Sequence, residues 1–159
     1  MLEVNGLCVD YAFDGRAHPV LKDLSLNVQA GEIVALVGES GAGKSTVGTS
    51  INGLLPSSAA IRAGKIRVAG QELSTLNEHG YARVRGREIA SVFQNPMITL
   101  NPFERIGKQL DETLVSNLDM QPQKASQRSR ELLTQVGFVD PSRVYNAYPH
   151  ELSGGMLQR

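Results

Sequence analysis

The sequence predicts an α/β fold built around a loop that binds phosphate groups. Residues 38–46 read Gly-Glu-Ser-Gly-Ala-Gly-Lys-Ser-Thr and match the pattern G-x-x-x-x-G-K-S/T. The apolar run at residues 32–37 before this loop is typical of a buried strand. Residues 46–55 after it are typical of a helix that stops at Pro56. A strand, a glycine-rich loop and a helix therefore follow in the order that phosphate binding requires.

The residue types in the loop indicate a nucleoside triphosphate as the ligand. Glycines let the backbone curl so that its N–H groups point inward and form an anion nest, to which the helix N-terminus adds partial positive charge. Lys44 supplies a full charge for the β- and γ-phosphates, and Ser45 supplies a hydroxyl for Mg²⁺. The alternative is a plain glycine-rich turn. The residues assigned to this site are Gly38, Ser40, Gly41, Gly43, Lys44, Ser45 and Thr46.

Composition limits the other classes of function. The chain has 159 residues, enough for one domain with a core, and its 16 basic residues balance 16 acidic ones. This balance argues against binding nucleic acid or an anionic membrane. Cys8 is the only cysteine, and we expect it to be a buried strand residue. The start of the chain lacks a signal-peptide pattern, and no apolar run approaches the roughly 18 residues of a membrane span. We expect a soluble protein of a reducing compartment.

The first 37 residues are expected to form a small, largely antiparallel sheet. Residues 1–9 and 20–28 alternate between apolar and polar types, as half-buried strands do. Residues 5–6, Asn-Gly, are a possible turn, and residues 11–15 are expected to be a loop. Residues 30–31, Ala-Gly, predict a second turn.

The middle of the chain alternates between loops and short elements. Residues 56–64 are expected to be a loop, and residues 65–70 a strand. Residues 73–87 are polar, with a short helix from Glu78. Residues 89–94 are apolar and predict a second buried strand that ends at Gln94.

From about residue 97 the sequence is helical in character. One helix is indicated by apolar residues at intervals of four, and a second is expected over residues 122–136. Residues 148–149, Tyr-Pro, predict a break, and residues 152–155 a glycine-rich turn into a further helix. The stripe of the first helix comprises Ile106, Leu110, Leu114 and Leu118.

Three further stretches match one known family together with the loop. They are residues 92–96 (Val-Phe-Gln-Asn-Pro), residues 152–156 (Leu-Ser-Gly-Gly-Met) and Tyr11 upstream of the loop. In combination they resemble the nucleotide-binding subunit of ABC transporters, over essentially the whole chain. The resemblance implies a P-loop NTPase, a RecA-like α/β core with an antiparallel β subdomain and a helical subdomain. The expected division is residues 1–37, 38–96 and 97–159.

The resemblance also implies roles for single residues. Tyr11 would stack on the adenine of ATP, with Phe13 as a weaker candidate. Gln94 would sense Mg²⁺ and the attacking water, which suits an amide that both donates and accepts. The signature residues would serve the γ-phosphate on the other subunit of a head-to-tail dimer, and they are Ser153, Gly154 and Gly155. The alternatives are a packing role for Tyr11, a polar strand end at Gln94 and a plain helix N-cap at Ser153.

A narrower resemblance concerns residues 95–102 and 148–156, which look like the oligopeptide, dipeptide and nickel importer branch. Met156, where most of the family has Gln, is usual there, and we expect it to be a packing residue. This implies an ATP-binding subunit at the cytoplasmic face of the inner membrane. Its partners would be transmembrane permease subunits contacted by residues 97–102, a second ATPase subunit, identical or paralogous, and an external substrate-binding protein. The alternatives are a non-catalytic nucleotide- or partner-binding module and a soluble ABC ATPase of repair or translation.

One family feature has no match in the sequence. The strand ending in Asp-Glu that follows the signature, and the switch histidine after it, are not found, and His18, His79 and His150 lie beside other motifs. We therefore expect the 159 residues to be the N-terminal part of a longer protein that hydrolyses ATP. We expect the 159 residues alone to be inactive. The apolar flanks of residues 33–37 and 89–93 should then be exposed.

Overall fold

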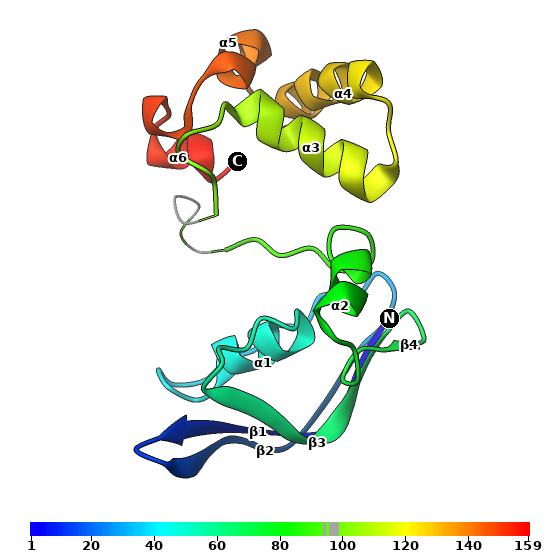
Figure 1. Ribbon diagram of the computed structural model, residues 1–159, viewed down its shortest axis with the longest axis vertical. Coiled ribbons are helices and arrows are strands. Elements are labelled where there is room, and N and C mark those ends of the chain that lie inside the picture. Colours follow the sequence, from blue (N-terminus) through cyan, green and yellow to red (C-terminus); the bar gives the residue numbers. More distant parts are fainter. Residues whose placement is uncertain (94, 96–98) are drawn as a thin grey trace. The chain divides into compact units, whose positions relative to one another are not determined.

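The computed structural model describes residues 1–93, 95 and 99–159. The chain divides into two compact units, Met1–Ile89 and Ala90–Arg159 (Figure 1). The predictions for Gln94 and for residues 97 and 98 of the expected permease contact lie outside the described residues.

The first unit is organised on an antiparallel sheet, as predicted. Its strands are β1 (Leu2–Phe13), β2 (Arg16–Val28), β3 (Ala59–Val68) and β4 (Gln71–Glu72), in the order β2-β1-β3-β4. β1 pairs with β2 on one side and β3 on the other. The strands contribute Val4, Leu7, Val9, Leu21 and Ile66 to the buried core.

Two predicted breaks in the sheet are wrong. β1 runs through Asn5 and Gly6 and continues to Phe13, so the turn falls at residues 14–15. Gly6 has a φ of +59°, and the pairing of β1 shifts register between Val4 and Leu7. The Asn-Gly pair therefore forms a bulge, which bends a strand without ending it. Cys8, next to the bulge, is half-buried, and its Sγ accepts from the Asp23 N–H at 3.3 Å.

β3 begins inside the stretch predicted to be a loop. It starts at Ala59, whereas the prediction placed the strand at residues 65–70. Residues 59–64 are mostly small and have weak strand preference, but they pair with β1, so tertiary context decides their conformation. Gly64 has a φ of +95°, and a Cβ built on it would lie 2.5 Å from the Gly6 carbonyl oxygen. Glycine at this position lets β3 lie close beside the bulge of β1.

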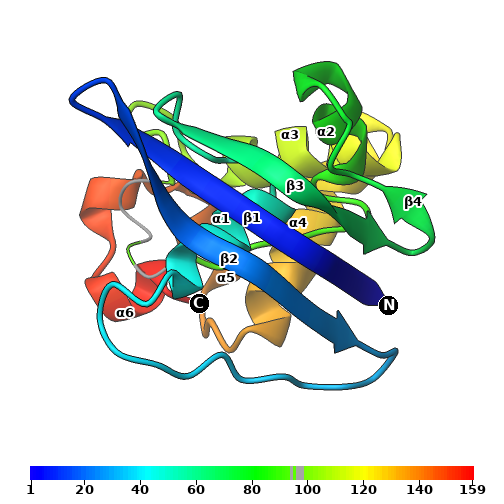
Figure 2. The same ribbon diagram turned by 90° about the horizontal axis from the view of Figure 1, so that it is seen from below.

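Two helices pack on the core of this unit. α1 (Lys44–Ile51) lies over one face of the sheet, and Figures 1 and 2 show it from two directions. α2 (Glu78–Val84) starts where predicted, with Asn77 Oδ1 accepting from the Gly80 N–H at 2.9 Å. Their contributions to the sheet's core cluster are Val47, Tyr81 and Val84.

The strands predicted at residues 32–37 and 89–94 are not formed in the described residues. Residues 32–37 belong to the irregular segment between β2 and α1, drawn in cyan in Figure 2, and residues 90–93 are also irregular. Ile33 is 97% exposed, Val37 91% and Val92 89%. In the described part of the chain no strand lies beside either run, so their backbone groups have no ladder to join. The exposure of these apolar flanks is as expected from the sequence.

The second unit is helical, as predicted. α3 (Ile106–Leu118) and α4 (Pro122–Gln135) pack together and with α5 (Pro141–Asn146). A short 3₁₀ turn, η2 (Pro149–Glu151), and α6 (Gly154–Leu157) follow (Figure 1). α5 was not predicted, although Asp140 caps it by accepting from the Arg143 N–H at 2.9 Å. No helix within the described ranges is long and apolar enough to cross a membrane.

Candidate functional site

Two glycines of the loop at residues 38–46 adopt a left-handed backbone conformation. Gly41 and Gly43 have φ values of +83° and +85°, which L side chains rarely adopt. Gly43 is the N-cap of α1, and the first helical bond runs from the Val47 N–H to the Gly43 carbonyl at 3.0 Å. The three preceding N–H groups of the first turn have no acceptor within the helix. The N-terminus of α1 therefore offers N–H donors beside a left-handed glycine turn, which suits phosphate oxygens.

Gly43 also lies close against β2. A Cβ built on it would lie 2.7 Å from Leu21 Cδ2, and β2 approaches it again through the Val20 carbonyl at 3.5 Å. Leu21 and Val47 are both buried in the core of the first unit. β2 thus supports the start of α1. The sequence pattern did not identify Leu21, because nothing local connects a strand residue to a loop that follows later in the chain.

Lys44 closes the loop onto itself. Its Nζ donates to the carbonyl oxygens of Gly38 at 2.7 Å and Glu39 at 2.6 Å. The Ala42 N–H donates to the Glu39 carbonyl at 3.2 Å and closes a turn around Ser40 and Gly41. The ammonium group is therefore already held at the loop by the same backbone that would surround a phosphate.

The hydroxyl residues that follow Lys44 differ in exposure. Ser45 is exposed, so its hydroxyl is accessible at the first turn of α1. Thr46 is buried and belongs partly to the packing of α1. A hydroxyl oxygen is a suitable ligand for Mg²⁺, which otherwise keeps waters and phosphate oxygens around it. Ser45 therefore fits the predicted metal contact, and Thr46 has a second, structural role.

Tyr11 lies near the support of the loop on β1. It pairs with His18 on β2 and Ala59 on β3, and it is partly buried against the core. Leu21, which contacts Gly43, pairs with Val9, about 7 Å along the strand from Tyr11. The partial burial of Tyr11 agrees with a packing role, the alternative given above. The adenine contact of Tyr11 stays a prediction.

Phe13, the weaker candidate for the adenine contact, lies at the end of β1. Its ring is 69% exposed and makes an edge contact with the His18 ring at 6.3 Å between centroids. Phe13 is more accessible than Tyr11. It lies at the turn between β1 and β2.

The signature stretch projects a serine and two glycines from an apolar anchor. Ser153 is the N-cap of α6, and its Oγ accepts from the Met156 N–H at 3.4 Å. Gly154 and Gly155 are exposed. Met156 packs against the core of the second unit, as predicted, together with Leu152 and Leu157. The N-cap role is present, and the γ-phosphate role stays a prediction.

Aromatic contacts fix the residues just before the signature stretch. The Tyr148 ring stacks on the His150 ring at 5.6 Å, and the Arg105 guanidinium lies 5.6 Å from the Tyr148 ring centroid. The Tyr148 N–H donates to Glu151 Oε2 at 2.7 Å. His150 and Glu151 are thereby engaged in local structure.

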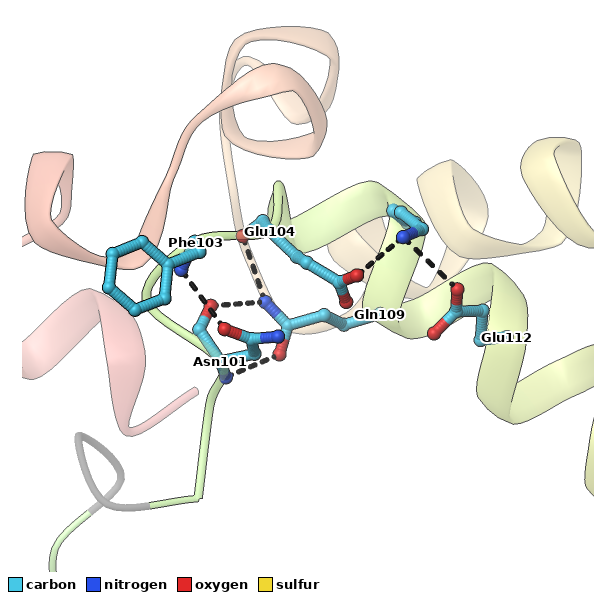
Figure 3. A network of polar contacts seen from close by, with 6 residues as sticks. Asn101, Phe103, Glu104, Gln109 and Glu112 are labelled. Carbon is cyan, nitrogen blue, oxygen red and sulfur yellow. Dashed lines mark hydrogen bonds and ion pairs between the residues drawn. The ribbon is translucent and has the colours of Figure 1, made fainter.

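Gln109 on α3 holds the turn at residues 101–104 through hydrogen bonds, as Figure 3 shows. Its Oε1 accepts from the Asn101 N–H at 2.9 Å, and its Nε2 donates to the carbonyls of Asn101 at 3.0 Å and Glu104 at 2.9 Å. Phe103, 87% exposed, projects from this turn. Nearby, Lys108 bonds Glu104 and approaches Glu112, and these carboxylates raise the pKa of Lys108.

Known proteins place this geometry in a family. The sequence profile of a family described as ABC transporter matches residues 21–159, which is most of the chain. The chain belongs to the ABC transporter family. Its fold agrees with a solved dimeric ATP-binding cassette in a post-hydrolysis state bound to ADP and phosphate, with a TM-score of 0.84 at 24% identity over 99% of this chain and 65% of that one. This confirms the predicted P-loop α/β fold with an antiparallel sheet and helices.

Two curated relatives of this ABC chain match it from end to end. It is 41% identical over 160 residues to the oligopeptide transport ATP-binding protein AppD of Bacillus subtilis, and covers 49% of that protein. It is 43% identical to the peptidoglycan transport ATP-binding protein YejF of Agrobacterium fabrum, and covers 29% of it. The chain thus spans about half the length of these relatives or less.

Proposed function

We propose that this chain is the nucleotide-binding part of the ATP-binding subunit of an ABC importer for peptides. The observation that carries the proposal is the loop at the start of α1, where glycine turns, first-turn N–H groups and Lys44 converge. The names of the relatives, which concern oligopeptide and peptidoglycan transport, support peptides as the substrate class. Nickel, the other substrate of the importer branch, has no such support.

The proposed roles follow the predicted site. Lys44 binds the β- and γ-phosphates, and Ser45 holds Mg²⁺, which supplies positive charge to the phosphates when bound. Tyr11 stacks on adenine and Gln94 orients the attacking water. Gly38, Ser40, Gly41, Gly43 and Thr46 complete the loop, and Ser153, Gly154 and Gly155 serve the γ-phosphate of a second subunit. Since phosphoryl transfer depends mainly on positioning and charge stabilisation, each of these groups acts by placement.

The proposed assembly has the subunit at the cytoplasmic face of the membrane, as a peripheral protein. There it pairs with a second ATPase subunit and binds transmembrane permease subunits, while an external protein selects the substrate. The intact protein couples ATP binding and hydrolysis to uptake. We assign residues 1–37 to the β subdomain, 38–96 to the nucleotide-binding core and 97–159 to the helical subdomain.

The experiment that tests the importer assignment is purification of the tagged protein from detergent-solubilised membranes of its own cells. We expect two integral membrane proteins and a second ATP-binding subunit to purify with it. The Lys44→Ala variant serves as a control, since loss of nucleotide binding should not remove the permease contact. Ribosomes or DNA in place of membrane proteins would show that the protein is a soluble ABC ATPase.

The adenine contact of Tyr11 can be tested by comparing a variant that lacks an aromatic ring with one that keeps it. We expect Tyr11→Ala to weaken ATP binding about fivefold or more, because base stacking contributes roughly 1–3 kcal/mol. Tyr11→Trp should preserve binding, since the π face remains. The measurement is isothermal titration calorimetry, with Phe13→Ala measured alongside because Phe13 is the other candidate for the adenine contact. Loss of affinity in both Tyr11 variants, or in neither, would leave Tyr11 with a packing role alone.

A further inference from the structure

One side chain outside the predicted site holds the far end of the phosphate-binding helix. Arg85 directly follows α2, and its Nε donates to the Asn52 carbonyl at 2.8 Å. One terminal nitrogen of the same guanidinium donates to the Gly53 carbonyl at 2.9 Å. Asn52 is the C-cap of α1, and Gly53 follows it with a φ of +63°. Arg85 therefore satisfies carbonyl groups that the end of a helix leaves without partners.

The guanidinium is itself held from two sides. Glu78 at the start of α2 accepts from both terminal nitrogens, at 2.6 Å and 3.3 Å, and Arg85 lowers the pKa of that carboxyl. The Tyr81 ring lies beneath the guanidinium at 5.1 Å. Tyr81 is 6% exposed, and a Cβ built on Gly53 would meet its ring at 2.6 Å. Arg85, Tyr81 and Gly53 thus form one packed contact between α2 and the end of α1.

The contact also marks where the next functional segment begins. Arg85 forms an isolated bridge with Ile89, and the Gly86 N–H donates to the Ile89 carbonyl at 2.8 Å. Residues 86–93 lead from this point toward Gln94, the proposed water-orienting residue. Arg85 therefore contacts the end of α1 through its side chain and the start of this segment through its backbone.

We propose that Arg85 is a positioning residue for nucleotide binding, which acts by holding α1 at its C-terminal end. This inference rests on the proposed function of the loop. α1 has eight residues and is about 12 Å long, so a tilt at its last turn moves the first-turn N–H groups and Lys44. A cation at the C-terminal end also complements the helix dipole. Arg85 thereby keeps the phosphate-binding end of α1 in one orientation before ATP arrives.

The geometry requires arginine. The guanidinium fork donates to two adjacent carbonyls and to a carboxylate at once, whereas a lysine ammonium is a single point with three donors. Arg85→Lys can keep the charge and part of the carbonyl contact, but it cannot keep the planar contact with Tyr81 and the paired bond to Glu78 together. We expect an intermediate phenotype from this variant.

The test compares ATP affinity with stability in the purified protein. Arg85→Met should weaken ATP binding about tenfold by calorimetry, and Arg85→Lys by less. Arg83→Met, at an exposed arginine that contacts His79, is the matched control and should bind as the unaltered protein does. Val84→Ala removes two buried methyl groups next to Arg85, so it should lower the unfolding midpoint and leave ATP affinity within about twofold.

Two results would overturn the proposal. One is an ATP affinity of Arg85→Met within about twofold of the unaltered protein. The other is an equal loss of affinity in Val84→Ala, since general destabilisation would then account for the effect. Lys44→Ala distinguishes a failure of this inference from a failure of the proposed function. If Lys44→Ala also binds ATP normally, the loop is not the nucleotide site and the role of Arg85 falls with it.

Discussion

Replacing Lys44 by alanine is expected to weaken ATP binding by about tenfold or more. Hydrogen bonds to a charged group contribute about 1.5–3 kcal/mol each, and a loss of 1.4 kcal/mol is a factor of ten in affinity. The ammonium lies at the loop, bonded to Gly38 and Glu39, so no large rearrangement is needed for it to reach a phosphate. Calorimetric titration of the purified protein with Mg²⁺-ATP measures the change.

Lys124→Ala is the control for this experiment. Lys124 is an exposed lysine on α4, and its removal changes the net charge by the same amount without altering the loop. We expect it to bind ATP with unchanged affinity. An unchanged affinity in Lys44→Ala would refute the assignment of residues 38–46 as the nucleotide site.

The largest effect on stability is expected from Gly64→Ala. The substitution strains a backbone with a φ of +95° and places a Cβ 2.5 Å from the Gly6 carbonyl oxygen and 2.6 Å from Leu7 Cα. Both neighbours are backbone atoms of β1, so they cannot move aside as a side chain could. We expect a loss of about 3 kcal/mol or more in the free energy of unfolding. Chemical denaturation followed by circular dichroism measures it.

Gly70→Ala separates the two causes of this loss. Gly70 also has a positive φ, +84°, but a Cβ there meets no heavy atom within 4 Å among the described residues. Only the backbone term applies, at about 1–2 kcal/mol. If both variants lose the same amount, the close approach of β3 to the bulge of β1 does not contribute to stability.

The parts of the fold that could be predicted are those with local signals. The glycines and Lys44 of the loop follow a fixed pattern, and the Ile106 to Leu118 stripe has the period of a helix. The short run of β3 before Gly64 has no such signal, because its pairing with β1 decides its conformation. Residues 32–37 have strand composition, but a strand also requires a neighbour, and composition does not reveal whether one is present.

The parts of the site that could not be predicted depend on contacts between distant residues. Arg85 contacts carbonyls 32 and 33 residues earlier in the chain, and it stands in a stretch with the charged residues Arg83, Arg87 and Glu88, which is typical of a surface. Leu21 on β2 packs against Gly43 at the start of α1. Such contacts leave no periodic pattern, so only the folded chain shows them.

The bonds between Lys44 and its own loop bear on which anions the site selects. With the ammonium bonded to two carbonyls, any anion that recruits Lys44 must replace bonds that the protein already makes. A single carboxylate or an inorganic phosphate offers few contacts in exchange. A polyphosphate offers oxygens to Lys44 and to the first-turn N–H groups at the same time. If the loop is the nucleotide site, we therefore expect these bonds to make it favour triphosphates over the small anions abundant in a cell.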